Sequence, residues 1–221
     1  MKRLMTMLYI LLAAGLGGCA SSPPVRYYSL NDGRPAAAGS PDGVGVAVAR
    51  VTLPELVDRP QMVSRKAEHR MQISENDRWA EPLRRQIPRL LARDLGEALD
   101  SGRIFATANE AWEVDVDFRV TVDIHLLEVI PGQRVAIDAT WRVEPRNGSA
   151  FFGRSLTWIG IDDMAQGNDY AGAVVAARKA LRALAGNIAG KIMAWPHMTS
   201  IAADAPATGV AKDGDALPVA Q

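Results

Sequence analysis

The chain has 221 residues, of which 48% are hydrophobic, and its 25 basic and 25 acidic side chains give a formal net charge of zero. This composition supplies a sizeable apolar core and excludes disorder of the whole chain. The balanced charge argues against a polyanion-binding protein, so we expect no nucleic-acid partner. The length suits one domain, or one domain with tails.

The N-terminus predicts export from the cytoplasm. Lys2 and Arg3 precede an apolar stretch from Met5 to Leu16, a pattern typical of a secretory signal peptide over residues 1–18. The stretch is too short to span a bilayer, which needs about 20 apolar residues. Cys19 is the only cysteine of the chain, so the sequence gives no indication of a disulfide bond.

The tetrapeptide Leu16-Gly17-Gly18-Cys19 resembles a bacterial lipobox. The resemblance implies cleavage before Cys19 and acylation of that residue, and several acyl chains together anchor a protein stably. An ordinary secretory signal that happens to contain a cysteine is the alternative. Residues 20–22 contain no aspartate, which by resemblance to enterobacterial lipoproteins favours the outer membrane over the inner one. We therefore expect an outer-membrane lipoprotein that faces the periplasm.

The N-terminal part of the mature chain predicts a spacer followed by strands. Residues 19–43 should form a flexible spacer that contains a short strand at 27–30. Residues 44–53 alternate valine with small residues, which predicts a buried strand. Residues 61–65 and 70–74 predict a pair of short strands.

A helix is predicted next, beginning between Asp77 and Pro82 and ending near Gly102, which suits a C-terminal cap. Pro88 lies inside this helix and should kink it, because proline lacks an amide donor. Its apolar residues recur at three- and four-residue steps: Leu83, Ile87, Leu90, Leu91, Leu95, Ala98 and Leu99.

The strongest periodic signal predicts a long strand from Trp112 to Leu126, with apolar residues at every second position. We expect a bend or bulge where Leu126-Leu127 breaks the alternation. Return strands at 135–143 and 151–159 should follow.

An alanine-rich helix from about Asp169 to Ala194 ends the predicted folded part. The order of elements predicts an α+β fold, with a mainly antiparallel mixed sheet and two helices packed on one of its faces. We expect a single domain over 44–195. Residues 196–221 should be a disordered tail, because they carry too few apolar side chains to offset the entropy of ordering.

Two segments carry a resemblance to a known family. The first is Val51–Val63 (VTLPELVDRPQMV) and the second is Arg78–Leu83 (RWAEPL). Together they resemble the signature of the PqiC (YmbA) family, the auxiliary lipoproteins of MCE-type transport systems, and the similarity covers most of 27–194. The resemblance implies a non-enzymatic outer-membrane component, without a cofactor, that partners an inner-membrane-anchored, PqiB-like MCE protein. It also implies a ring-like homo-oligomer.

Candidate partner-binding residues lie in these two segments. Leu56 and Val57 are expected to be exposed in a loop that two prolines stiffen, and Arg59 could pair bidentately with a carboxylate. A loop that serves chain geometry alone is the alternative. Trp79 could anchor an interface or belong to the core.

Arg85, Arg89 and Arg93 lie along one side of the first predicted helix at four-residue steps. They could meet lipid headgroups or an acidic partner surface. A solvated helix face is the alternative. Trp112 is in phase with the apolar face of its strand, which favours a core position.

Catalytic and metal motifs are weak or absent. No nucleophile elbow, P-loop or dinucleotide-binding glycine run occurs. The histidines lack the spacing of zinc ligands: His69, His125 and His197. Glu113, Asp115 and Asp117 put three carboxylates on one strand face, which could bind calcium or act as an acid/base pair. A solvated strand face is the alternative.

Three hypotheses follow for the function. The first is an outer-membrane lipoprotein that docks the end of an MCE-type lipid conduit. The second is an adaptor for another envelope machine, such as cell-wall or outer-membrane-protein assembly. The third is a small envelope hydrolase that would use the three carboxylates.

Overall fold

The computed structural model describes residues 23–35, 38–106, 115–161 and 170–203. The predictions for the signal peptide, Cys19, Trp112, Glu113 and the tail beyond residue 203 lie outside these ranges. The elements in chain order are β1 (Arg26–Tyr28), β2 (Val46–Thr52), β3 (Gln61–Ala67), β4 (Arg70–Trp79), α2 (Leu83–Leu99), β5 (Ile104–Ala106), β6 (Phe118–Ile130), β7 (Arg134–Pro145), β8 (Phe151–Gly160) and α3 (Ala171–Ala203).

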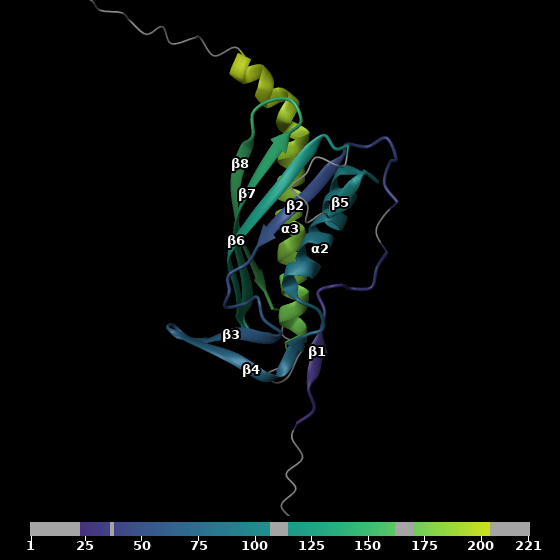
Figure 1. Ribbon diagram of the computed structural model, residues 1–221. Coiled ribbons are helices and arrows are strands. Elements are labelled where there is room, and N and C mark those ends of the chain that lie inside the picture. The colour runs from purple at the N-terminus through teal and green to yellow at the C-terminus, as the bar shows by residue number, and fades with distance from the viewer. Residues whose placement is uncertain (1–22, 36–37, 107–114, 162–169, 204–221) are drawn as a thin grey trace, which may run out of the picture.

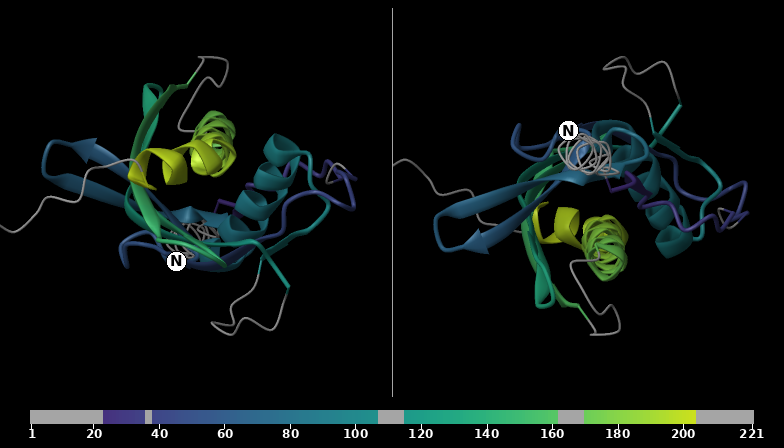
Figure 2. Two further views of the ribbon diagram at one scale, coloured as in Figure 1. Left: turned by 90° about the horizontal axis from the view of Figure 1, so that it is seen from above. Right: turned by 90° about the horizontal axis from the view of Figure 1, so that it is seen from below.

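A five-stranded sheet forms the main layer, in the order β5-β2-β6-β7-β8 (Figure 1). Its β5-β2-β6 half is parallel and its β6-β7-β8 half is antiparallel. Helix α2 packs on β2 and β5, and α3 packs on β7 and β8. Both helices lie on the same side of the sheet (Figure 2). This arrangement confirms the predicted α+β class.

Strand β6 contains the predicted bulge. Its pairing with β7 shifts register between Ile124 and Leu126. Before the bulge the buried apolar side chains are at even positions, as at Val122, whereas after it they are at odd positions, as at Leu127 and Val129. One extra residue reverses the pleat, so the core face stays apolar across the break in the sequence alternation.

Helix α2 begins directly after Pro82, whose fixed φ suits the start of a helix. It continues past Pro88 and ends at Leu99 with Asp100 in the left-handed conformation, at φ 47°. The prediction that Gly102 caps this helix is therefore wrong. Gly102 lies beneath the loop at 38–40, where an added Cβ would stand 3.1 Å from the Ala38 carbonyl oxygen.

A second, three-stranded sheet has the order β1-β4-β3. The predicted pair of short strands is the antiparallel β3–β4 hairpin, and β1 adds to β4 in parallel, with Tyr28 opposite Trp79. Figure 1 shows this sheet at the end of the molecule that is opposite the C-terminal end of α3. Arg65 of β3 forms an ion pair with the buried Glu128 of β6, which links the two sheets.

One apolar core lies between the five-stranded sheet and the helices, and it includes residues from Leu30 to Ile192. The inward face of α3 is buried in it, and small residues on that face, such as Ala173, Ala177 and Ala180, allow close packing on the sheet. Helix α3 extends to Ala203, beyond the expected end near residue 194.

Candidate functional site

The segment that would follow a lipid anchor is held against both helices. We call residues 29–34 the N-terminal strap. Gln86 of α2 is 3% exposed, and its side-chain oxygen accepts the backbone N–H of Leu30 at 3.0 Å and the hydroxyl of Ser29 at 3.2 Å. Its amide group donates to the carbonyl of Glu81. These hydrogen bonds satisfy the buried amide group of Gln86, and they hold the strap against α2.

Arg93 holds the next part of the strap. Its Nη1 donates to the Asp32 carboxylate at 2.9 Å and to the Arg34 carbonyl oxygen at 3.2 Å. The Arg93 side chain is only 9% exposed because the strap covers it. The hydrogen bond from Arg93 is the main cause that keeps the pKa of Asp32 well below its usual range.

The same arginine lies beside a buried ion pair between the two helices. Asp94 of α2 is 3% exposed, and Arg178 of α3 binds both of its carboxylate oxygens. Arg182 adds a hydrogen bond to Glu97 at 2.7 Å and lies 3.8 Å from Asp94. Burial alone would lower the pKa of Arg178, but its hydrogen bonds and charge interaction with Asp94 raise it.

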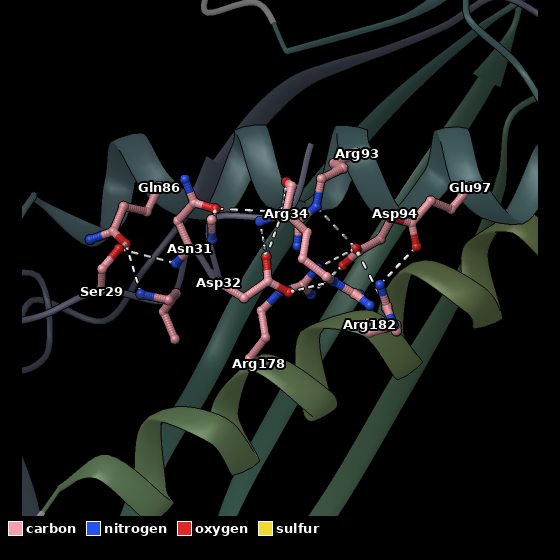
Figure 3. A network of polar contacts seen from close by, with 12 residues as sticks. Ser29, Asn31, Asp32, Arg34, Gln86, Arg93, Asp94, Glu97, Arg178 and Arg182 are labelled. Carbon is pink, nitrogen blue, oxygen red and sulfur yellow. Dashed lines mark hydrogen bonds and ion pairs between the residues drawn. The ribbon is translucent and has the colours of Figure 1, made fainter. Parts of the chain in front are cut away.

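Figure 3 shows these side chains as one continuous polar network from the strap to α3. Four arginines meet three carboxylates in it: Arg34, Arg93, Arg178 and Arg182 with Asp32, Asp94 and Glu97. Each charged side chain therefore has an opposite charge beside it within the protein, so the network has a structural role. The sequence analysis missed it, although Asp94 on the apolar stripe of a helix was a usable signal, since an isolated charge is almost never fully buried.

The sequence-predicted loop residues divide into exposed and buried positions. Leu56 is 41% exposed, as expected, whereas Val57 is buried at 7% and the prediction that it is exposed is wrong. Val57 points inward because its N–H closes a turn on the Pro54 carbonyl at 3.0 Å. Among the described residues Arg59 has no carboxylate partner, and its buried Nε makes no hydrogen bond, so the predicted bidentate pair is not formed there.

Trp79 lies in the core at 9% exposure, at the end of β4. Its backbone N–H donates to the Pro60 carbonyl at 2.7 Å. The two segments that carry the family resemblance therefore meet in space, because Pro60 of the first is hydrogen-bonded to Trp79 of the second. Trp79 thus connects the loop that contains Pro60 with the chain that leads into α2.

The strap covers one of the three arginines in the predicted row on α2 and leaves the other two exposed. Arg85 and Arg89 keep side-chain exposures of 68% and 59%, whereas Arg93 is covered. Both exposed arginines form ion pairs with Glu81. Arg84, which the sequence analysis did not single out, lies 3.6 Å from Asp58.

These exposed arginines border a groove of about 540 Å³ between α2 and β2, which we call the basic groove. Its lining combines four arginines with small apolar residues: Ala49, Arg50, Val51, Arg84, Arg85, Pro88, Arg89 and Ala106. Two carboxylates, Asp58 and Glu81, pair with three of these arginines, so positive charges outnumber negative ones within these ion pairs. The adjacent Arg84-Arg85 pair was the available sequence signal.

Two residues of the predicted acidic face, Asp115 and Asp117, lie in the described part of the chain, and both form structural contacts. Asp117 accepts the backbone N–H of Gly45 at 2.6 Å and lies 3.7 Å from Arg103. Asp115 forms an ion pair with Arg146. Within the described ranges no three His, Cys, Asp or Glu side chains gather as metal ligands would. None of the helices described there is long and apolar enough to span a membrane.

A second carboxylate near the N-terminal segment is also buried. Asp77, at 5% exposure, accepts hydrogen bonds from Arg26 at 2.7 Å and from Ser74 and Tyr28. Burial alone would raise the pKa of Asp77, but these hydrogen bonds and the charge of Arg26 outweigh it and lower the pKa. Asp77 therefore holds β1 beside β4 through side chains as well as through the backbone.

Comparisons with known structures support the fold. An uncharacterized protein is 19% identical, with a TM-score of 0.58, and the match covers 77% of this chain and 99% of the other. A Xanthomonas campestris protein assigned to the DUF330 family is 16% identical, with a TM-score of 0.51, covering 82% of this chain and 98% of the other. No curated protein matches the sequence.

The family signature of "ABC-type transport auxiliary lipoprotein component" matches residues 28–189. The match begins inside β1 and runs through most of α3, so it includes the strap, both helices and both sheets. It confirms the resemblance to the PqiC (YmbA) family. The chain therefore belongs to the family of ABC-type transport auxiliary lipoprotein components.

Proposed function

We propose that this protein is an outer-membrane lipoprotein, anchored through Cys19, that docks and assembles one end of an MCE-type intermembrane lipid transport complex. The observation that carries the proposal is the family match over 28–189, directly preceded by a lipobox-like sequence. In this role the protein binds partners and carries out no bond chemistry. Its natural partner is an inner-membrane-anchored, PqiB-like MCE protein, which it would meet as a homo-oligomer.

The N-terminal contacts support an anchored role. Arg26 is the seventh residue after Cys19, and an extended chain of that length spans at most about 25 Å. The membrane would therefore lie close to the end of the molecule that carries the three-stranded sheet. Any pull on the anchor reaches β1 first and then the strap, both of which are held by buried side chains, Asp77 and Gln86.

Exposed residues in the first family segment and directly after the second one are the proposed partner contacts. Leu56, Arg85 and Arg89 are accessible, and the two arginines lie on the rim of the basic groove. We assign this surface to an acidic or amphipathic segment of the partner, because its charge is positive and its floor is apolar. Arg59 and Trp79 would act through the shape of the loop that presents Leu56.

The test is an affinity pull-down of the full-length, lipidated protein from its native envelope, read by mass spectrometry. Recovery of an MCE-domain membrane protein in comparable amount is the expected result. Recovery of cell-wall or outer-membrane assembly factors without it would replace this proposal with the adaptor hypothesis. Cys19→Ala should release the protein from the membrane, and an unchanged membrane fraction would contradict the anchor.

A charge reversal localises the contact. Arg85→Glu with Arg89→Glu should reduce partner recovery at least tenfold. The matched control is Lys66→Glu with Lys191→Glu, which makes the same charge change at two exposed positions outside the groove. Equal loss in both variants would show that overall charge, and not the groove, determines recovery.

A further inference from the structure

Strand β8 forms one edge of the five-stranded sheet, and it differs from the other edges of the molecule. The edge strands β5 and β1 have three residues each, and the edge strand β3 has seven, with a lysine, Lys66, and two register shifts in its pairing, whereas β8 has ten residues. Proteins ordinarily protect sheet edges with short strands, lysine, proline or bulges. Strand β8 (FFGRSLTWIG) has no lysine or proline, and its pairing with β7 runs without a register shift.

The outer face of β8 is apolar and exposed. Phe152, Leu156 and Trp158 are exposed to 69%, 54% and 49%. They alternate along the strand and therefore lie on one face. Arg142 and Arg134 of β7 lie over the rings of Phe152 and Trp158, with guanidinium-to-centroid distances of 5.4 and 4.3 Å, and both rings stay exposed. Figure 1 shows no described element beyond β8 on its free side.

The backbone orientation of β8 follows from one hydrogen bond. The N–H of Ile161 donates to the Gln133 carbonyl at 2.9 Å, in the register that pairs Gly160 with Arg134 one step earlier. Hydrogen-bonded and non-hydrogen-bonded pairs alternate in antiparallel sheets, so the odd-numbered residues of β8 bond to β7. The even-numbered residues, which carry the exposed apolar side chains, therefore point their N–H and C=O groups to the open edge.

We propose that this edge pairs with the β8 edge of a second copy of the chain, antiparallel, with Phe152 opposite Trp158 of the other copy. The free N–H and C=O groups of the even-numbered residues in the two copies then face each other, and Arg154 lies opposite Leu156. A shift in one direction would place Arg154 opposite itself, with like charges in contact. A shift in the other direction would place Phe152 opposite Gly160 and lose the aromatic contact.

A second copy is favoured as the occupant because the edge is complementary to itself. Every apolar side chain gains an apolar neighbour or an arginine stem, and the one charged residue on the face, Arg154, remains paired with Asp138 of its own β7 at 2.8 Å. The contact has twofold symmetry and closes after two copies, so a larger ring would need a second, different contact. The pairing is independent of which transport system the protein serves.

Cysteine cross-linking tests the register directly. Residues opposite each other in a hydrogen-bonded pair have Cα atoms about 5.5 Å apart, which a disulfide can bridge. Arg154→Cys and Leu156→Cys chains, carried on different tags and co-expressed at full length, should form a mixed disulfide dimer under mild oxidation. Either variant expressed alone should not. Absence of the mixed dimer, or dimers of Leu156→Cys alone, would overturn the proposal.

Hydrodynamic mass provides the second test. In detergent, the full-length protein should contain at least two copies per particle, and Leu156→Lys should at least halve that number. Val175→Lys is the matched control, because Val175 is also 55% exposed but lies on α3. A monomeric wild-type protein would overturn the proposal and leave β8 to a partner strand or the membrane. Equal masses of the two lysine variants would also overturn it.

Discussion

Replacing Asp94 with alanine should destabilise the fold by about 3–5 kcal/mol, because it leaves a buried guanidinium without its counter-charge. The Asp94 side chain is 1% exposed and that of Arg178 is 11%, so water cannot compensate for the loss. Arg182, 3.8 Å from the same carboxylate, would lose a second favourable interaction. For a protein of this size, a loss of that magnitude lowers the melting temperature by roughly 6–20 °C.

The assay is urea unfolding of the full-length protein in detergent, followed by circular dichroism. Glu97→Ala is the control, because it breaks the partly exposed pair with Arg182 and should cost at most about 1 kcal/mol. The double variant Asp94→Leu with Arg178→Met should recover most of the lost stability, since apolar residues of similar volume can replace a buried ion pair.

Two results would refute this reasoning. One is an Asp94→Ala protein whose free energy of unfolding lies within about 1 kcal/mol of wild type. Such a value would place the pair in solvent, contrary to its burial between α2 and α3. The other is a double variant no more stable than Asp94→Ala, because it would mean that the charges were not the source of the cost.

Three further outcomes can be measured on the same protein. Gln86→Leu removes the acceptor of the Leu30 backbone N–H in the strap, so the free energy of unfolding should fall by about 1–3 kcal/mol. The Leu30 amide should also exchange faster with deuterium, and an unchanged exchange rate would exclude the contact. The pKa of Asp77 is lowered in the folded state, so its stabilisation is present above the unfolded value of about 3.9 and is lost as pH falls through the folded value. Asp77→Asn should therefore be less stable at pH 7 and should lose less stability between pH 5 and pH 2, and parallel acid-unfolding curves would contradict this. Gly153→Ala places a methyl group within the indole of Trp141 and should cost about 1–3 kcal/mol. Gly160→Ala, with nothing within 4 Å, is its control, and equal urea midpoints for the two variants would refute the clash.

Periodicity in the sequence predicted the antiparallel half of the fold well. Strands β6, β7 and β8 alternate between a core face and a solvent face, and such alternation can be read from residue type alone. The bulge near Leu126 was predictable for the same reason, since only an inserted residue keeps both halves of β6 in phase with the core.

The parallel pairings could not be predicted in this way. Strand β2 pairs with β6 and β5, and β1 pairs with β4, across separations that leave no local signal in the sequence. The same limit applies to the polar network. Asp94 and Arg178 are 84 residues apart, so their pairing depends on how α2 and α3 pack. Arg93 appeared to belong to an exposed row because the covering strap is distant in sequence.

If the chain is exported as proposed, the position of the strap determines when the fold can be completed. The strap would cross the inner membrane first, yet Gln86 and Arg93, which hold it, lie more than fifty residues later in the sequence. The inter-helix pair that lies beside Arg93 also requires Arg178, which emerges near the end of the chain. The strap would therefore stay undocked until almost the whole chain has crossed the inner membrane. During this interval the predicted signal sequence and Cys19 would remain accessible to processing enzymes, and the fold would close over the strap only afterwards.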